Sequence, residues 1–280
     1  MNNLKIYSNF IKAEHTLFSL PIIFSGAFLA AKGVPDIKIL LLIIVAGIGA
    51  RTSAMAVNRI LDRKIDKLNP RTKDRELPSG KINLRTSFLI TICGTILYLV
   101  SAYFICGLVF KLSPIPLIVF IVYPLLKKFT QFCHFGVGLA LGLAPLGGFI
   151  AVTCSLENSL PGVLLGLFAF FWVSGFDIIY ATLDEEFDRN EGIYSLVSVY
   201  GKPLAMKISA ACHILAVVFL LFLYFIAFKS MISFIILIMI AFLLYMEHKK
   251  SSDVDLAFFK INIVIGSMVF VFILGGIYFI

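Results

Sequence analysis

Nine long apolar stretches constrain the fold of this chain more than any other feature. A helix needs roughly 17–25 mostly apolar residues to cross the hydrocarbon core of a bilayer. Only 14% of the 280 residues are charged, whereas about a quarter are charged in a typical soluble domain. Because so apolar a surface needs lipid around it, we expect an all-α integral membrane protein, with one domain over residues 1–280 built as a bundle of nine transmembrane helices. The stretches are about His15–Ala31, Ile37–Val57, Ser87–Phe110, Pro114–Leu126, Phe132–Val152, Pro161–Leu183, Leu204–Phe228, Met231–Met246 and Leu256–Ile280.

The basic residues distinguish the two sides of this predicted bundle. The net charge is +8, and most Lys and Arg residues lie in the connections after the second, fourth, sixth and eighth stretches. Basic loops of membrane proteins face the cytoplasm. We therefore expect a cytoplasmic N-terminus and a location in the cytoplasmic (inner) membrane. The basic residues alternate with apolar spans and form no compact basic domain, which argues against a nucleic-acid partner.

The longest polar stretch follows the second apolar stretch directly. It runs over Asn58–Lys81 and reads NRILDRKIDKLNPRTKDRELPSGK. Asn58, Asp62 and Asp66 are four residues apart, so on a helix their side chains lie on one face. This spacing predicts a row of oxygen-bearing side chains at the cytoplasmic end of a membrane helix.

A second row with the same spacing ends the sixth apolar stretch, where Tyr180, Asp184 and Asp188 lie on one predicted helix face. Two carboxylate rows that face each other repel unless cations lie between them. Mg²⁺ takes oxygen ligands and is usually held by one or two carboxylates together with substrate phosphates. We therefore expect the two rows to meet at the cytoplasmic side and to bind Mg²⁺ with a diphosphate. The alternative is that these acids are solvated helix ends paired with neighbouring basic residues.

Further charged residues fit the same site. Arg71 and Arg75, with Lys73 and Lys81, follow the first row and would reach diphosphate oxygens, the arginines in bidentate fashion. The alternative is a basic loop that only sets membrane topology. Asp177 lies about two turns deeper than Asp184, where a carboxylate would orient an aromatic acceptor or take a proton from it. Its alternative role is a hydrogen bond to a neighbouring helix. His134, His213 and His248 show no partner pattern and receive no predicted role.

The motifs NRILDRKID and YATLDEEFD resemble those of the UbiA superfamily of intramembrane aromatic prenyltransferases. The resemblance extends along most of the chain and is closest to the 4-hydroxybenzoate polyprenyltransferases and to the related enzymes of the futalosine route to menaquinone. Its blocks are EHTLFSLP at Glu14–Pro21, NPRTKDRELPSGKI at Asn69–Ile82, YPLLKKFT at Tyr123–Thr130, LGLAPLGGFIAV at Leu141–Val152 and GFDIIYATLDEEFDRNEGIYSL at Gly175–Leu196.

The resemblance implies a nine-helix UbiA-like bundle that transfers a polyprenyl group from a polyprenyl diphosphate to an aromatic acid in quinone biosynthesis. Carried over by motif position, the metal-binding residues would be Asp62, Asp66, Asp184 and Asp188. The diphosphate-binding residues would be Asn58, Arg71, Arg75 and Lys127. Many members have Lys-Arg where this chain has Lys127-Lys128; Lys128 would meet the carboxylate of the acceptor as a point charge.

The mechanism expected from these residues is ionisation of the allylic C–O bond, with Mg²⁺ and the basic loop stabilising the leaving diphosphate. Tyr180 would shield the allylic cation by cation–π contact, and Asp177 would remove the ring proton. One alternative is an ion-coupled transporter, which would place its acids at mid-membrane. Another is a phosphoalcohol transferase of lipid synthesis, which also uses rows of Asp and Mg²⁺.

Overall fold

A computed structural model describes residues 3–12, 16–251, 253 and 260–279. Within these ranges the chain forms thirteen helices and no strand, so the all-α prediction is confirmed for them. The helices are α1 (Asn3–Phe10), α2 (Thr16–Ala31), α3 (Ile37–Leu68), α4 (Leu84–Ile105), α5 (Gly107–Leu112), α6 (Pro114–Leu126), α7 (Cys133–Thr153), α8 (Leu160–Ala181), α9 (Glu185–Asn190), α10 (Leu196–Tyr200), α11 (Lys202–Ala227), α12 (Met231–Lys249) and α13 (Asn262–Tyr278).

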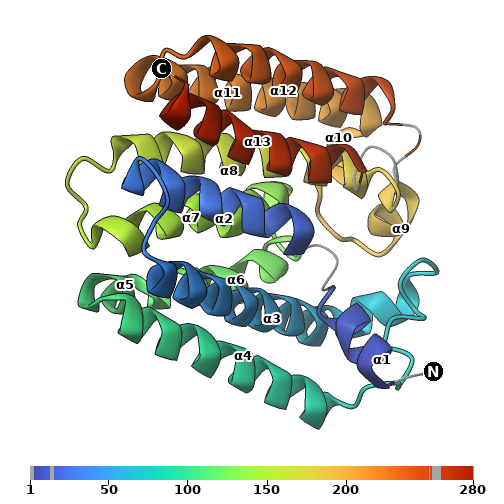
Figure 1. Ribbon diagram of the computed structural model, residues 1–280. Coiled ribbons are helices and arrows are strands. Elements are labelled where there is room, and N and C mark those ends of the chain that lie inside the picture. The colour runs from blue at the N-terminus through green and yellow to red at the C-terminus, as the bar shows by residue number, and fades with distance from the viewer. Residues whose placement is uncertain (1–2, 13–15, 252, 254–259, 280) are drawn as a thin grey trace.

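The long helices lie side by side in layers (Figure 1). Helices α11, α12 and α13 form one side and α3 and α4 the other, with α2, α7 and α8 between them. Helix α8 is apolar on all sides and is the most buried of the long helices, as expected for a helix without a polar face. Its Leu165, Phe168 and Trp172 are almost completely buried. The central helix therefore carries the second acidic motif out of the core.

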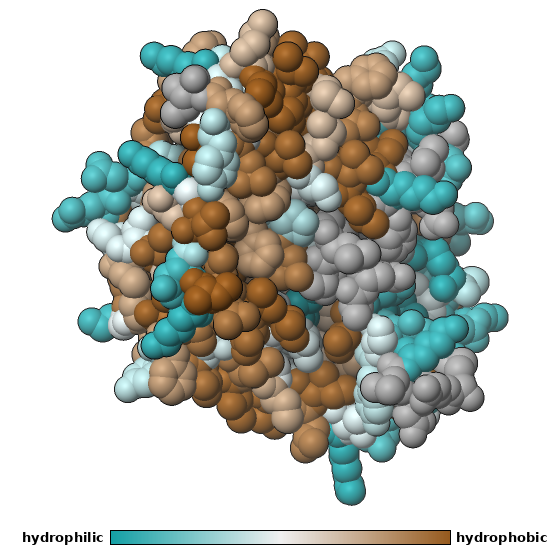
Figure 2. Space-filling model, viewed as in Figure 1, coloured by the Kyte–Doolittle hydropathy of each residue, from teal (hydrophilic) through white to brown (hydrophobic). Residues whose placement is uncertain are grey.

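Seven helices of the described residues are long and apolar enough to cross a membrane, namely α3, α4, α5 with α6, α7, α8, α11 and α12. Two shorter apolar helices, Ser19–Ala31 and Asn262–Tyr278, match the first and last predicted spans. The predicted count of nine is thus not confirmed, and the starts of those two spans, at His15 and Leu256, lie outside the described residues. Apolar side chains cover the middle of the face in Figure 2, and polar side chains gather toward its two ends.

The boundary between the third and fourth spans differs from the prediction. The expected span over Ser87–Phe110 is divided, because α4 ends at Ile105 and Cys106 adopts an extended conformation with φ −170° and ψ 163°. The chain then reverses, and Gly107–Leu126 forms the next apolar segment. Pro114 begins α6, where a missing backbone N–H costs no helical hydrogen bond. The fourth span is therefore longer than predicted and the third is shorter.

Helix α3 positions the first acidic motif. It continues as one helix for 32 residues, eleven past the expected end of the apolar span at Val57. At 1.5 Å per residue it is about 48 Å long, which exceeds the roughly 30 Å thickness of the hydrocarbon core. Its last turns therefore extend beyond the apolar layer and carry the polar residues with them.

Close contact between α7 and α8 depends on glycine. A Cβ atom at Gly142 would lie 2.9 Å from the Gly166 carbonyl oxygen, and one at Gly138 would lie 2.1 Å from Ser174 Oγ. Small residues let helix backbones approach closely in membranes. This approach brings the C-terminal half of α8, with Asp177, against the start of α7.

Candidate active site

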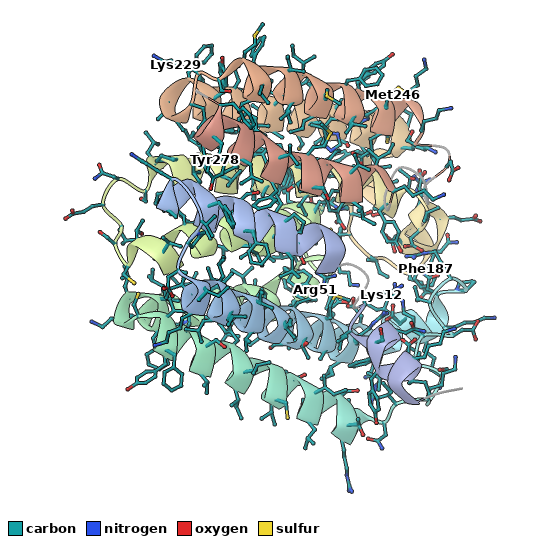
Figure 3. All side chains as sticks on the ribbon, viewed as in Figure 1. Lys12, Arg51, Phe187, Lys229, Met246 and Tyr278 are labelled. Atoms are coloured by element: carbon teal, nitrogen blue, oxygen red, sulfur yellow. The ribbon has the colours of Figure 1, made fainter. Side chains whose placement is uncertain are left out.

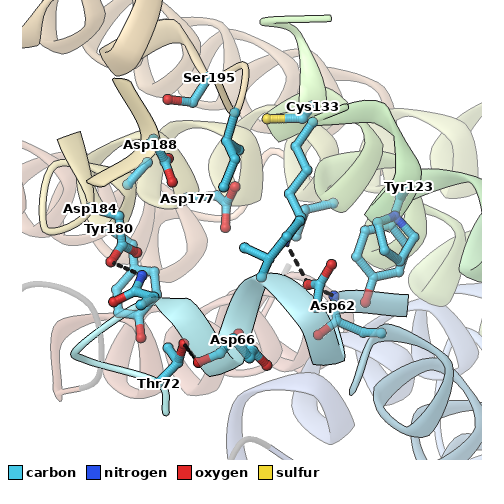
Figure 4. Close-up of a pocket in the computed structure, with 18 of the residues that line it drawn as sticks. Asp62, Asp66, Thr72, Tyr123, Cys133, Asp177, Tyr180, Asp184, Asp188 and Ser195 are labelled. Carbon is cyan, nitrogen blue, oxygen red and sulfur yellow. Dashed lines mark hydrogen bonds and ion pairs between the residues drawn. The ribbon is translucent and has the colours of Figure 1, made fainter. Parts of the chain in front are cut away.

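A polar cavity of about 300 Å³ opens at the end of the bundle where α3, α6, α8 and α9 meet the connection after α3. Of the eleven predicted site residues, ten line it. They come from segments more than 100 residues apart, as Figure 4 shows for the acidic residues of α3 facing those of α8 and α9. The ten are Asn58, Asp62, Asp66, Arg71, Arg75, Lys127, Asp177, Tyr180, Asp184 and Asp188. The prediction that the two motifs lie at the same end of the bundle agrees with this arrangement.

The first acidic row lies on one face of α3, as its spacing predicted. Asn58 Nδ2 donates to Asp62 Oδ2 at 3.2 Å. The same Asp62 oxygen is 2.6 Å from Lys127 Nζ of the α6 end, and Asp66 Oδ1 is 2.7 Å from an Arg75 guanidinium nitrogen. Both carboxylates are buried. The negative charge of each carboxylate is therefore offset by a basic residue that we predicted to bind the diphosphate.

The second row is not one continuous helix, contrary to expectation. Helix α8 ends at Ala181, and α9 begins at Glu185 with Asp184 as its N-cap. Thr182 Oγ1 donates to the Ile179 carbonyl oxygen at 2.7 Å, satisfying one of the acceptors that a helix end leaves unpaired. Tyr180 and Asp184 thus lie on different elements, yet both still face the cavity.

Arg71 joins the two parts of this second row. Its Nε donates to Asp184 Oδ1 at 2.9 Å, a second guanidinium nitrogen contacts Asp184 Oδ2, and a third donates to the Tyr180 hydroxyl at 2.6 Å. The guanidinium also lies 4.9 Å from the centre of the Tyr180 ring. Asn69 adds a hydrogen bond of 2.8 Å to Asp184. Sequence reasoning assigned no role to Asn69, although its place directly before Pro70 and Arg71 was visible.

Asp184 and Asp188, which lie beyond the end of α8, have different pKa values because their surroundings differ. Burial opposes ionisation of Asp184, but hydrogen bonds from Arg71 and Asn69 and the nearby arginine charges outweigh it and lower its pKa below the ordinary value. Burial, together with the charge of Asp184, raises the pKa of Asp188 to about 6. At neutral pH both groups are therefore available as carboxylate ligands, and Asp188 loses this form first as the pH falls.

The deeper carboxylate, Asp177, has a partner on the neighbouring helix. His134 Nδ1 lies 2.7 Å from Asp177 Oδ2, and His134 Nε2 accepts the backbone N–H of Leu196 at 3.4 Å. Because Nε2 accepts, the proton of a neutral imidazole is on Nδ1 and is donated to Asp177. The alternative of a hydrogen bond between helices is therefore observed. The Asp177 side chain is 23% exposed, so the contact with His134 orients it while leaving it accessible from the cavity.

Two apolar cavities continue from the polar one toward the other end of the bundle. An inner cavity of about 190 Å³ shares Met55, Tyr123, Val137 and Asp177 with the polar cavity. A third, of about 130 Å³, shares Ile23, Gly47, Ala50, Phe120, Ala140 and Ala144 with the inner one. The three together form one path, polar at one end and apolar along the rest.

Arg51 is the one cation among the described residues that lines the inner cavity. It lies on α3, seven residues before Asn58, and farther from the polar end than Lys12 and Phe187 (Figure 3). Sequence reasoning missed it and also left His134 without a role. A single Arg inside an otherwise apolar span was the available signal, because charged residues within membrane helices are functional by default.

The acidic residues suit a magnesium ion that also binds a substrate. Asp62 Oδ1 and Asp66 Oδ2 are buried and accept no hydrogen bond within the described part of the chain, which is unusual for buried carboxylate oxygens. No three His, Cys, Asp or Glu side chains of the described residues lie close enough to hold an ion by themselves. Mg²⁺ fits this donor set, because it is commonly bound by one or two carboxylates, waters and substrate phosphates.

Three predicted basic residues lie elsewhere. Lys128 lines a neighbouring cavity of about 260 Å³ with Phe187 and Glu191. Lys73 and Lys81 do not line the polar cavity either. The assignment of Lys128 to the acceptor carboxylate therefore stays a prediction that this geometry does not favour, since Arg51 is the cation that faces the inner cavity.

Comparisons with known proteins identify the relatives of this arrangement. The model of the UbiA prenyltransferase family matches residues 19–264. A 4-hydroxybenzoate octaprenyltransferase of Vesicomyosocius okutanii subsp. Calyptogena okutanii (strain HA) is 32% identical over 196 residues, which is 69% of each chain. The apo structure of a UbiA homologue from Aeropyrum pernix K1 superimposes with a TM-score of 0.85 at 30% identity, over 93% of this chain and 97% of that one. A UbiA homologue from Archaeoglobus fulgidus bound to GPP and Mg²⁺ shares the fold, with a TM-score of 0.72 at 19% identity over 97% and 99% of the two chains.

Proposed function

This chain belongs to the UbiA prenyltransferase family and is a polyprenyltransferase, and we propose that it transfers a polyprenyl group from a polyprenyl diphosphate to a ring carbon of an aromatic acid of the 4-hydroxybenzoate type. The observation that carries the proposal is the meeting of two acidic motifs on one cavity, with a buried oxygen of Asp62 and one of Asp66 that accept no hydrogen bond from the described residues. The product would enter the synthesis of a respiratory quinone.

The diphosphate and Mg²⁺ would be held between α3 and the start of α9. Asp62, Asp66, Asp184 and Asp188 would bind the metal, as supported by the GPP and Mg²⁺ of the Archaeoglobus fulgidus homologue. Mg²⁺, when bound, offsets the negative charge of the leaving diphosphate. Arg71, Arg75 and Lys127, which form ion pairs with Asp184, Asp66 and Asp62, would turn to phosphate oxygens, and Asn58 would support them.

The isoprenoid tail would run along the α2, α3, α6 and α7 side of the inner cavity into the third cavity, and the α8 side of the inner cavity would be left to the acceptor. Burial of the apolar tail along this path stabilises binding. We also propose that α2 and α13 cross the bilayer, completing nine spans in a single domain with the polar cavity toward the cytoplasm. The charge asymmetry of the connections supports this orientation.

The acceptor would bind in the inner cavity between Arg51 and Asp177. An Arg in an apolar cavity stabilises a carboxylate by bidentate hydrogen bonds. The acceptor ring would then lie next to Asp177, which His134 holds at 2.7 Å. Asp177 would accept the proton that the ring carbon releases after it bonds to the allylic carbon. Tyr180, which lines the polar cavity, would face the allylic cation with its ring and exclude water.

The geometry argues against the two alternatives. A transporter would hold its acids at mid-membrane beside broken helices, whereas four of the five cavity carboxylates here lie in the last two turns of α3 or beyond the end of α8. A phosphoalcohol transferase would need an alcohol acceptor, and the cation in the inner cavity favours an acid.

The test uses membranes given polyprenyl diphosphate, 4-hydroxybenzoate and Mg²⁺, with mass spectrometry of the products. We expect a C-prenylated acid from the wild type and none from Asp62→Ala or Asp184→Ala. Asp74→Ala, an exposed acid of the same polar connection, is the matched control and should retain turnover. Normal product formation by either active-site variant contradicts the proposal, and a phosphodiester product would support the phosphoalcohol transferase instead.

A further inference from the structure

A buried polar network lies behind the candidate site, and no step of the proposed reaction uses its residues. Trp172 Nε1 on α8 donates to Asn262 Oδ1 on α13 at 2.7 Å. Asn262 Nδ2 donates in turn to Glu247 Oε1 on α12 at 3.1 Å. The exposed fractions of the three residues are 1%, 0% and 0%. Buried polar groups in membrane helices are energetically costly unless they are paired. Few other residue types could therefore replace these three without leaving a polar group unpaired.

A second chain of hydrogen bonds reaches the same tryptophan through its backbone. His213 Nε2 on α11 lies 3.3 Å from the Trp172 carbonyl oxygen, and His213 Nδ1 lies 3.0 Å from His248 Nε2 on α12. The carbonyl can only accept, so Nε2 of His213 carries a proton, and in the neutral imidazole Nδ1 then accepts from His248. The His213 ring also lies against Gly175, where an added Cβ would be 2.2 Å from the imidazole. Three helices thus hold one short segment of α8.

That segment connects the network to the inner cavity. The Trp172 indole contacts the Phe176 ring edge-to-face, with centroids 5.7 Å apart at 77°. Phe176 lines the inner cavity, and the next residue is Asp177. Aromatic pairs prefer this geometry and resist rotation out of it. A change in the indole position therefore shifts the cavity wall beside the carboxylate.

We propose that Trp172 and Asn262 are positioning residues for the aromatic acceptor: the hydrogen bond between them fixes the indole, and the indole fixes the Phe176 ring against which the acceptor binds. This inference rests on the proposed function and extends it to residues outside the cavity. The network reaches the inner cavity, where the acceptor would bind, through the ring contact between Trp172 and Phe176, and neither of these residues lines the polar cavity of Asp62 and Asp184. Changes in the network should therefore alter binding of the aromatic acceptor and leave binding of the diphosphate unchanged.

The test is the steady-state kinetics of Trp172→Phe and Asn262→Leu, with each substrate varied in turn. Trp172→Phe keeps an aromatic ring but removes the N–H donor, and Asn262→Leu keeps the approximate volume but removes the hydrogen bonds to Trp172 and Glu247. We expect the KM for the aromatic acid to rise on the order of tenfold to a hundredfold, because a small misplacement near a reacting centre has effects of this size. The KM for polyprenyl diphosphate and the Mg²⁺ dependence should stay as in the wild type.

Ser233→Ala is the matched control. Ser233 is fully buried and its Oγ donates to the Phe272 carbonyl oxygen at 2.9 Å, also between α12 and α13, but it lines none of the three cavities. It should lower thermal stability without changing the KM for the acid. If Trp172→Phe behaves like this control, or raises both KM values equally, the inference is overturned. Where Trp172→Phe is not recovered folded, Asn262→Leu and Phe176→Leu are judged by the same criterion. A wild type that makes no prenylated acid overturns the proposed function, whereas a normal wild type with unaltered variants overturns only this inference.

Discussion

Replacing Arg71 with lysine tests the proposed site most directly, because it keeps the positive charge and removes the planar guanidinium that can donate two parallel hydrogen bonds. Arg71 donates to both oxygens of Asp184 and to the Tyr180 hydroxyl. A lysine ammonium acts as a point charge and cannot reproduce the planar fork. In the proposed complex Asp184 would help to hold Mg²⁺ and the guanidinium of Arg71 would bind diphosphate oxygens, so Arg71→Lys should weaken transition-state binding.

The expected size follows from the number of hydrogen bonds that a lysine cannot make. A hydrogen bond to a charged group contributes about 1.5–3 kcal/mol, and of the three present at Arg71 a lysine would keep one. The upper bound is therefore about 3–6 kcal/mol. The Arg71 side chain is 31% exposed, so water compensates for part of this difference, and we expect about 1.5–3 kcal/mol. This corresponds to roughly a tenfold to hundredfold fall in kcat/KM for the polyprenyl diphosphate.

The assay is product formation in membranes at saturating aromatic acid and Mg²⁺, with the polyprenyl diphosphate varied. Lys73→Gln is the control, because Lys73 lies in the same connection, is exposed and does not line the cavity. We expect it to keep at least most of the wild-type kcat/KM. The reasoning is refuted if Arg71→Lys matches the wild type, or if Lys73→Gln lowers activity as much, since the loop would then act only by its overall charge.

Three further outcomes follow from the site. Asp62→Asn should reduce the apparent Mg²⁺ affinity by at least about tenfold, because a buried carboxylate ligand is removed; Mg²⁺ titration of turnover checks this, and an unchanged midpoint contradicts it. Burial and the charge of Asp184 raise the pKa of Asp188 to about 6, so its carboxylate form disappears as the pH falls through that value. The apparent Mg²⁺ affinity should therefore rise between about pH 5 and pH 7, and Asp188→Asn should flatten this part of the profile; an identical profile in the variant refutes the assignment. Arg51→Met should raise the KM for the aromatic acid by roughly tenfold to a hundredfold, the effect expected for the loss of one charge-assisted pair of hydrogen bonds. The KM for the polyprenyl diphosphate should stay unchanged. Equal effects on both KM values would show that the acid binds elsewhere.

Local patterns accounted for the class of protein and for the first acidic row. The apolar stretches exceed what a soluble core needs, and the spacing of Asn58, Asp62 and Asp66 depends only on the helical period. Helix α3 continues without a break through these residues, so the period alone placed them on one face. The same reasoning failed at Tyr180 and Asp184, because a spacing of four residues does not reveal that α8 ends at Ala181.

The partners of the site residues could not be read from the chain in this way. The contacts between His134 and Asp177 and between Trp172 and Asn262 join residues 43 and 90 positions apart. No periodicity relates such positions, because their distance depends on how closely α7, α8 and α13 pack. Lys128 shows the converse: it is next to Lys127 in sequence, and both line the neighbouring cavity, but only Lys127 also lines the polar cavity.

Runs of consecutive residues were enough to place this chain in a membrane, to show which end carries its charge, and to identify the carboxylates that form a row, since hydropathy and helical spacing are local properties. Helix packing, in contrast, determines which cation faces each carboxylate, brings Arg51 to the inner cavity, and sets α12 and α13 behind the wall beside Asp177. Small residues such as Gly138 and Gly142 permit this packing at close range. Packing acts between segments that are distant along the chain, and so leaves no local pattern from which to predict it.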